Sequence, residues 1–122
     1  MSLSTTPREV ATAFVKAFAS RQMEDAAEWV ADEVAFTSPR VQIRGRDAYL
    51  AAVGEFSGVV TGLDLLETFG DESRAMLLYD MHTAPFGVIR AADLYVVQDG
   101  LIVRNDLLFD TAAMRPTSSV EG

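Results

Sequence analysis

The sequence contains no cysteine and a single histidine, His82, among its 122 residues. Without cysteine, a disulfide framework, a thiolate nucleophile and a cysteine-ligated zinc site are all excluded. A single histidine also excludes the histidine-pair metal motifs, so any metal site would have to be rich in carboxylates. Several large classes of enzyme are therefore ruled out.

Positive charge is scarce, with 10 Lys and Arg residues against 18 Asp and Glu residues and a formal net charge of -8. An acidic surface repels the phosphates of nucleic acids, so we expect no nucleic-acid partner. The basic residues are scattered apart from Arg40, Arg44 and Arg46. These three lie in a loop-like stretch, which is more typical of a solvated face than of a binding patch.

Long hydrophobic runs are missing as well. Residues 1–8 are polar and lack the apolar core of a signal peptide, and no apolar run approaches the length of a membrane span. We therefore expect a cytoplasmic protein with no membrane partner. The length suits a single domain over residues 1–122, with an ordered core over about residues 6–113.

Helical patterns occupy much of the N-terminal half. Residues 6–9 combine a hydroxyl cap, a proline in the first turn and a glutamate three residues after the cap, which predicts the start of a helix. A second helix is predicted from Ser20 to Val30, and a third over residues 47–56. A short strand over residues 34–38, ended by Pro39, separates the second helix from the third.

The C-terminal half has the pattern of strands joined by tight turns. Asp99-Gly100 is the strongest two-residue hairpin signal in the chain. Helices gathered before a run of strands indicate an α+β domain in which helices cover one face of a curved sheet. The predicted strands cover residues 63–69, 74–83, 88–98 and 101–109.

Two of these strands, near residues 75–81 and 88–97, are apolar on both faces. An antiparallel strand with one solvated face should alternate between apolar and polar residues. If helices cover one face, a second copy of the same sheet is the economical cover for the other. We therefore expect a homodimer formed through the sheet.

The order of these elements, together with the segments 34–39, 45–48 and 97–102, resembles the nuclear transport factor 2-like superfamily from about Pro7 to Phe109. This superfamily includes ketosteroid isomerases, SnoaL-like polyketide cyclases and limonene epoxide hydrolases. The resemblance implies a cystatin-like cone, in which three helices of the N-terminal half cover the concave face of a curved antiparallel sheet. A deep apolar cavity would lie between the helices and the sheet.

The resemblance also implies site residues, and it implies that the protein needs no metal and no cofactor. Where ketosteroid isomerases have an oxyanion-donating tyrosine on the first helix, this chain has Phe14, and where they have an aspartate base before a proline it has Ser38. Their aspartate on the strand that enters the last hairpin is retained as Asp93. SnoaL-like cyclases have a histidine on one central strand and an acid on the next, matched here by His82 and Asp93.

Asp93 lies in an otherwise apolar stretch, residues 91–97. If it faces the cavity, desolvation should raise its pKa and keep the carboxyl group protonated near neutral pH. A neutral carboxylic acid can donate a hydrogen bond to a substrate enolate or act as a general acid. The alternative is a structural carboxylate that is hydrogen-bonded to its neighbours.

His82 and Asp80 are two residues apart, so their side chains point to the same face of their strand. If that face is the one with Asp93, the cavity holds two acids and an imidazole, and His82 could remove a proton next to a carbonyl. A one-residue change of register would place both on the opposite face and leave Tyr79 and Met81 in the cavity. The sequence leaves the two registers open.

Aromatic residues are spread over several elements, and some of them would line a pocket for an apolar ligand in a cone fold.

The resemblance and the candidate residues leave two functions open. The first is a cofactor-independent SnoaL-like enzyme that performs cyclase, isomerase or dehydratase-type acid/base chemistry on a hydrophobic carbonyl compound, with Asp93, His82 and Asp80 as catalytic residues. The second is a non-catalytic ligand-binding or dimerisation module of the same fold. The predicted pocket residues are Phe14, Trp29, Phe36, Ser38, Phe56, Tyr95, Asn105 and Phe109.

Overall fold

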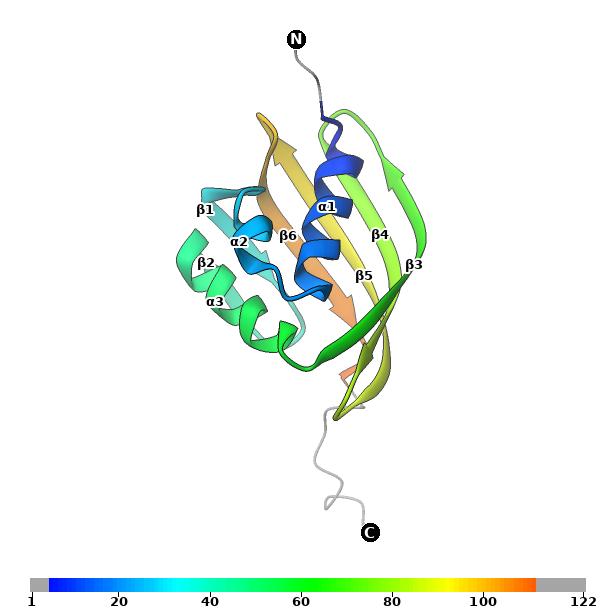
Figure 1. Ribbon diagram of the computed structural model, residues 1–122. Helices are drawn as coiled ribbons and strands as arrows, with labels where there is room; N and C mark the ends of the chain where they lie inside the picture. The colour runs from blue at the N-terminus through cyan, green and yellow to red at the C-terminus, as the bar shows by residue number, and fades with distance from the viewer. Residues whose placement is uncertain (1–4, 112–122) are drawn as a thin grey trace.

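The computed structural model describes residues 5–111, which form one curved sheet with helices on its concave face (Figure 1). The six strands lie in the order β2-β1-β6-β5-β4-β3. Helix α1 packs against β3, β4 and β5, and α3 packs against β1 and β2. The predicted α+β class is confirmed. The elements are α1 (Pro7–Ala19), α2 (Met23–Ala27), β1 (Val30–Thr37), β2 (Gln42–Arg44), α3 (Arg46–Ser57), β3 (Val60–Gly70), β4 (Arg74–Thr83), β5 (Gly87–Gln98) and β6 (Leu101–Phe109).

One strand pair departs from the expected antiparallel sheet. β1 pairs with β6 in parallel, while the other neighbouring pairs are antiparallel. The sheet is therefore mixed, with one parallel pair between β1 and β6. The expected end of the ordered core at residue 113 lies outside the described residues.

Helix α1 begins where its sequence predicts. The Thr6 hydroxyl accepts a hydrogen bond from the backbone N–H of Glu9 at 3.1 Å, and the Glu9 carboxylate accepts one from the N–H of Thr6 at 3.0 Å. This reciprocal pair is a capping box, with Pro7 in the first turn. The apolar side of the helix, which includes Val10 and Phe14, is buried against the sheet.

Helix α2 is shorter than predicted and does not begin at Ser20. Ser20 instead ends α1, since its N–H donates to the carbonyl of Lys16 at 3.0 Å. At the other end, Val30 pairs with Ile102 as the first residue of β1, and the N–H of Ile102 donates to the carbonyl of Trp29 at 2.7 Å. Pairing with a strand more than 70 positions away thus overrides the local helical pattern, a competition that propensity cannot decide.

The segment that joins β1 to β2 is held by Ser38. Its hydroxyl accepts hydrogen bonds from the N–H groups of Arg40 at 3.3 Å and Val41 at 3.2 Å, and its own N–H donates to the carbonyl of Val41 at 2.9 Å. Strand β2, which the sequence analysis missed, follows directly. The three-residue strand is too short for its alternation to stand out in the sequence.

Arg46 is part of the framework and not of a solvated face. Its guanidinium donates to the carbonyl of Ala27 at 2.9 Å and to that of Val30 at 3.2 Å, and the side chain is half-buried. These carbonyls lie at the end of α2 and the start of β1. Arg46 therefore ties the start of α3 to the α2–β1 junction.

Arg46→Ala is expected to lower the free energy of unfolding by about 1–2 kcal/mol, because two backbone carbonyls lose a charged donor. Arg44→Ala is the matched control, since Arg44 is exposed on β2, and it should change stability by less than about 0.5 kcal/mol. Urea unfolding followed by circular dichroism measures both. Equal effects for the two variants would contradict the role given to Arg46.

The two hairpins of β4, β5 and β6 fix which residues face the helices. Asp99 and Gly100 both have positive φ, at 54° and 79°, as a two-residue hairpin of the predicted kind requires. Gly87, at φ 73°, begins β5 opposite Thr83. In the resulting register the buried residues of β4 are the odd-numbered ones, so Tyr79 lies on the concave face with Asp93.

Candidate active site

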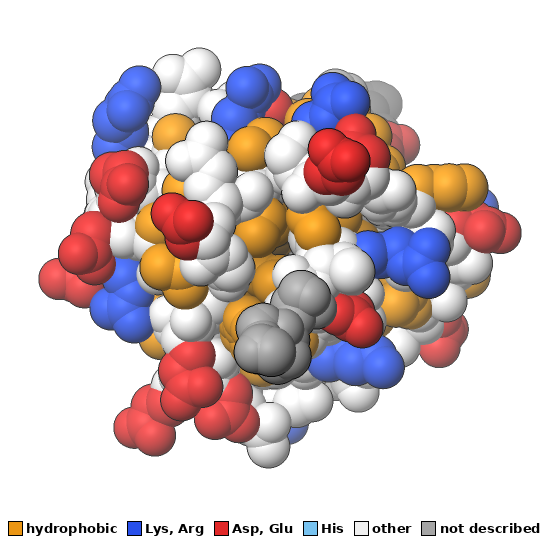
Figure 2. All heavy atoms as spheres, turned by 90° about the horizontal axis from the view of Figure 1, so that it is seen from above, with side chains coloured by type: hydrophobic (Ala, Val, Ile, Leu, Met, Phe, Trp, Pro, Cys, Tyr) orange, Lys and Arg blue, Asp and Glu red, His pale blue; other side chains and the backbone are white. Residues whose placement is uncertain are grey.

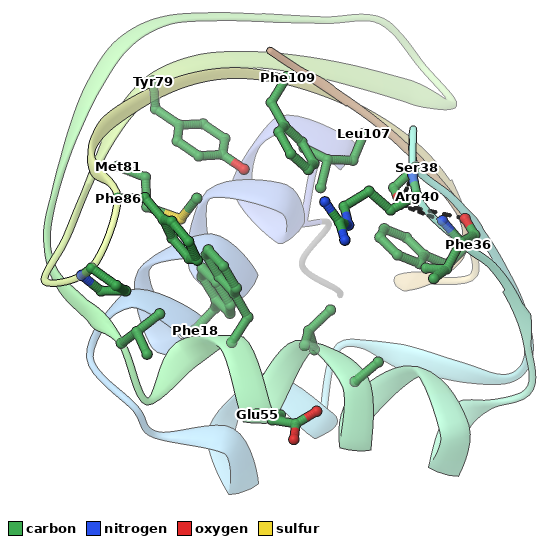
Figure 3. Close-up of a pocket in the computed structure, with 16 residues that line it drawn as sticks. Phe18, Phe36, Ser38, Arg40, Glu55, Tyr79, Met81, Phe86, Leu107 and Phe109 are labelled. Atoms are coloured by element: carbon green, nitrogen blue, oxygen red, sulfur yellow. Dashed lines mark hydrogen bonds between the residues drawn. The ribbon is translucent and has the colours of Figure 1, made fainter. Parts of the chain in front are cut away.

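A cavity of about 560 Å³ lies between the concave face of the sheet and helix α3 (Figure 3). Most of its wall is apolar and aromatic, and exposed residues such as Val41 and Pro85 border its opening. Such a volume is typical of a site for one small organic molecule. The residues that line it are Phe18, Phe36, Ser38, Arg40, Val41, Ala52, Val53, Glu55, Phe56, Val59, Tyr79, Met81, Pro85, Phe86, Leu107 and Phe109.

The predicted pocket residues divide into two groups. Those that line the cavity are Phe36, Ser38, Phe56 and Phe109. The others do not line it and are Phe14, Trp29, Tyr95 and Asn105.

The interior of the cone is filled beyond the cavity, which explains why the second group does not line it. The Phe14 ring stacks on that of Tyr49 with centroids 5.8 Å apart, and it meets the Tyr95 ring edge-on at 6.0 Å. All three rings are buried. Trp29 is half-buried beside the core. These side chains do not line the cavity, because helix α1 packs onto β3, β4 and β5 at this end of the cone.

Asp93 is enclosed at the centre of a polar group within this filled region. Only 2% of its surface is exposed, and it does not line the cavity. Its carboxylate accepts hydrogen bonds from the hydroxyl of Tyr79 at 2.5 Å, the hydroxyl of Tyr95 at 3.0 Å and the amide of Asn105 at 3.0 Å. The carboxylate is thus buried but well supplied with donors.

A further tyrosine, Tyr49, orients one of these donors, the amide of Asn105. The hydroxyl of Tyr49 donates to Oδ1 of Asn105 at 2.7 Å, which leaves the Asn105 amide to face Asp93. The sequence analysis named Asn105 as a pocket residue but did not connect it with Asp93. The two residues lie on adjacent strands, β5 and β6, and their partnership depends on the register of that pair.

Burial governs the ionisation of this group. It raises the pKa of Asp93 above the usual 3.8, although the hydrogen bonds from Tyr79, Asn105 and Tyr95 act in the opposite direction. Burial, followed by the nearby Asp93 carboxylate, holds the pKa values of Tyr49, Tyr79 and Tyr95 well above 10. The three phenols therefore remain protonated donors at neutral pH.

Tyr79 connects the buried group to the cavity. Its ring forms part of the cavity wall, its hydroxyl points into the enclosed space, and the same hydroxyl bonds to Asp93 (Figure 3). Sequence reasoning reached Tyr79 only as a consequence of the alternative register. Tyr79 and Asp93 share the inner face of neighbouring strands. The sequence could have indicated this only if the register between the two strands had been known.

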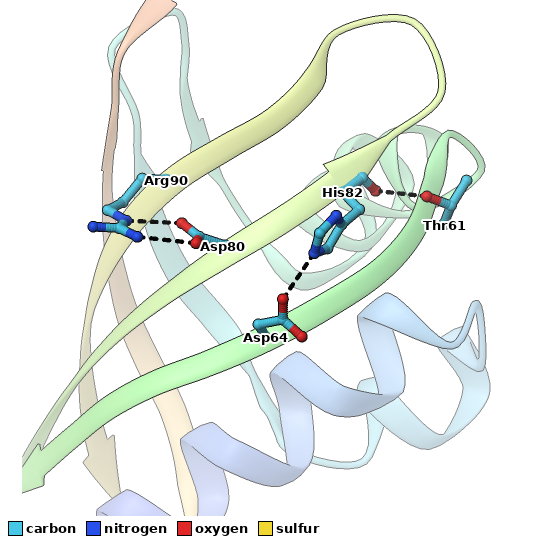
Figure 4. Close-up of polar contacts among 5 residues, drawn as sticks. All are labelled: Thr61, Asp64, Asp80, His82 and Arg90. Carbon is cyan, nitrogen blue, oxygen red and sulfur yellow. Dashed lines mark hydrogen bonds and ion pairs between the residues drawn. The ribbon is translucent and has the colours of Figure 1, made fainter.

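His82 and Asp80 lie on the outer face of the sheet, opposite the cavity (Figure 4). Asp80 accepts two hydrogen bonds from the guanidinium of Arg90, at 2.7 and 2.9 Å, and this partner holds the pKa of Asp80 below its usual value. His82 is paired with Asp64 at 2.9 Å. The structure therefore does not bring His82 and Asp80 together with Asp93, because strand alternation places them on opposite faces.

Within residues 5–111, no cluster of three or more histidine, aspartate or glutamate side chains is arranged to hold a metal ion. No helix in the same part of the chain is long and apolar enough to cross a bilayer.

Figure 2 shows the molecule from the end where α1 begins. Among the described residues on that face, charges of both signs are spread around the rim with apolar side chains between them.

The family model of the SnoaL-like domain matches residues 11–105. The chain belongs to this family. No curated protein matches the chain. Among solved structures, it is similar to a protein from Kribbella flavida DSM 17836, with 32% identity, 91% of this chain and 92% of the other covered, and a TM-score of 0.87.

Two further structures share the fold of this SnoaL-like protein. An NTF2-like protein of unknown function from Cytophaga hutchinsonii has 19% identity and a TM-score of 0.79, with 93% of this chain and 98% of the other covered. An LEH-like epoxide hydrolase from M. tuberculosis has 16% identity and a TM-score of 0.75, with 88% and 85% covered. Identities this low show the fold alone, so the function has to be inferred from the residues of this cavity.

Proposed function

We propose that this SnoaL-like protein is a small enzyme, independent of any cofactor, that performs acid/base chemistry on an apolar carbonyl compound bound in the cavity. The observation that carries the proposal is the position of Tyr79. It lines the cavity while its hydroxyl makes a 2.5 Å hydrogen bond to the buried Asp93. A phenol backed by a carboxyl group of raised pKa is a suitable partner for a carbonyl oxygen.

The protonation state of Asp93 decides whether Tyr79 can donate a hydrogen bond to a ligand. When Asp93 is ionised, Tyr79 gives its only proton to the carboxylate and offers a ligand just the lone pairs of its oxygen. When Asp93 is protonated, its O–H can donate to the Tyr79 oxygen, and the phenol proton is free to turn to the ligand. Burial, which raises the pKa of Asp93, favours this second arrangement.

The apolar wall complements this donor. A hydrophobic substrate would place its body against the phenylalanine rings and its carbonyl oxygen near Tyr79. As a proton leaves the neighbouring carbon, negative charge develops on that oxygen, and the phenol hydrogen bond strengthens. Tyr79 would act as the catalytic residue and Asp93, which does not reach the cavity, as its positioning residue.

A non-catalytic ligand-binding module is the second candidate, and the lack of a well-placed base favours it. Glu55 is the carboxylate among the lining residues, but it is exposed, and Figure 3 shows it on the outer side of α3. In the enzyme, the proton taken from the substrate would therefore have to pass to water at the open mouth. A binding module needs no such acceptor.

The two candidates differ in what happens to a bound ketone. We expect the protein to accelerate deuterium exchange next to the carbonyl of 2-tetralone, an apolar ketone, when NMR follows the reaction in D2O. Tyr79→Phe should reduce this acceleration about a hundredfold, the usual effect of losing one donor to a developing oxyanion. Tyr95→Phe, which removes another donor to Asp93 away from the cavity wall, is the matched control and should cost less than about tenfold.

A ketone that binds but exchanges no faster than in buffer would overturn the enzymatic proposal and leave the binding module. Equal rates for the wild type and Tyr79→Phe would reject the role given to Tyr79. Binding itself can be followed from the methyl resonance of Met81, since this side chain lines the cavity.

A further inference from the structure

We propose that Arg40 makes the cavity selective for anionic ligands, so that its natural ligand is an apolar molecule that carries a carboxylate. The inference rests on the proposed function, because it takes the same cavity as the binding site. It adds the chemical class of the ligand.

Arg40 is a cation placed at an apolar wall. It lines the cavity, and Figure 3 shows its guanidinium pointing inward, toward the space that the Tyr79 hydroxyl also faces. Among residues 5–111, no carboxylate lies within ion-pair distance of Arg40. On the outer surface, by contrast, Arg90 and Arg104 are each paired with an aspartate.

The backbone beneath Arg40 is held in place while its side chain is not. The N–H of Arg40 donates to the hydroxyl of Ser38 at 3.3 Å, and the neighbouring Pro39 restricts the chain further. The side chain itself is exposed and makes no hydrogen bond to the rest of the described chain. The backbone of Arg40 is therefore held in place, while its guanidinium is able to move toward a ligand and bind it.

The surroundings of Arg40 favour a carboxylate as that group. A guanidinium binds a carboxylate through two parallel hydrogen bonds, a geometry that a lysine could not offer. Phe36, Leu107 and Phe109 form the nearby wall and exclude water from one side of the pair, which strengthens its attraction. In a protein of net charge -8, an anion gains from a cation directly at the opening.

The two polar groups of the cavity would then orient one ligand. Arg40 would hold the carboxylate near the mouth, the phenylalanine rings would enclose the apolar body, and a carbonyl would reach Tyr79. A keto acid or another carbonyl compound with an acidic end fits this arrangement. Glu55, the lining residue of opposite charge, lies on the α3 side and is directed outward, so it does not neutralise Arg40.

Two probes of equal shape test the inference, namely 2-naphthoate, an anion, and 2-naphthamide, its neutral analogue. Calorimetry should show that the wild type binds 2-naphthoate more tightly, and that Arg40→Gln loses about tenfold in affinity for it while its affinity for 2-naphthamide is unchanged. Arg44→Gln removes the same charge from neighbouring β2 without touching the cavity and should leave both affinities unchanged.

The outcomes separate this inference from the proposed function. If 2-naphthamide perturbs the Met81 methyl resonance but 2-naphthoate is not preferred, the inference fails and the cavity remains a binding site. Equal losses for Arg40→Gln and Arg44→Gln would also overturn it, because net charge alone would then explain the effect. If neither probe binds, the inference and the proposed function fail together.

Discussion

Asp93→Leu is expected to lower the free energy of unfolding by about 4 kcal/mol, the largest effect on stability that we predict for a single substitution. The leucine would leave three buried donors, on Tyr79, Tyr95 and Asn105, without their acceptor. A buried donor without an acceptor destabilises the folded state, because its lost hydrogen bonds to water are not replaced. Urea unfolding followed by circular dichroism measures the loss.

Asp93→Asn provides a second measurement in case the leucine variant does not fold. It keeps one acceptor oxygen but turns an amide toward donors, so a loss of about 2 kcal/mol is expected. Asp64→Leu is the matched control on the exposed side of β3 and should change stability by less than about 1 kcal/mol. A leucine variant as stable as the wild type would show that the hydrogen bonds to Asp93 merely offset the cost of its burial.

The second large effect concerns the outer face of the sheet. We propose that two copies of the chain pair through an outer patch made of Phe69, Met76, Leu78, Leu94 and Leu108. The register places Phe69, Met76 and Leu94 in one row across β3, β4 and β5. Phe69 is 62% exposed and Leu108 67% exposed. Side chains this apolar and this open are typical of a protein interface.

Leu108→Asp is expected to convert such a dimer to a monomer. A two-fold interface contains the substitution twice, so about 2 kcal/mol at each position raises the dissociation constant about a thousandfold. Light scattering coupled to size-exclusion chromatography measures the mass directly.

Val41→Asp is the matched control for this substitution. Val41 is also exposed, at 46%, but it borders the cavity instead of the outer patch, and this variant should keep the mass of the wild type. A monomeric wild type would reject the pairing of two copies. A Leu108→Asp variant that remains dimeric would place the interface elsewhere.

Most of the fold could be predicted because its signals are local. The capping box of Thr6 and Glu9 marks the start of α1, and the Asp99-Gly100 turn marks the last hairpin. β4 and β6 have the bounds predicted from the pattern of strands joined by tight turns. The error at α2 lies where the chain pairs with a distant partner, as Trp29 does with Ile102. β2 was missed because a strand of three residues is too short to show an alternating pattern.

The site was less predictable than the fold. The apolar stretch around Asp93 predicted a desolvated carboxyl group on the condition that it faces the cavity, whereas the structure buries Asp93 without placing it in the cavity wall. The same context could not tell that Asp93 lies behind Tyr79 and not in the cavity wall. Arg40 was interpreted as part of a solvated cluster, because nothing in its neighbours shows that the β1–β2 loop meets the cavity.

The sequence by itself indicated the α+β class and the bounds of the long strands, because these follow from neighbours a few residues apart, and its resemblance to a known superfamily implied the SnoaL-like fold. Only the tertiary structure decided which side chains face inward and which partners they meet. Tyr79 and Asp93 are 14 residues apart, and Tyr49 and Asn105 are 56 apart. Such contacts depend on the register between strands, and a shift of one residue exchanges the two faces of a strand while leaving its local pattern unchanged.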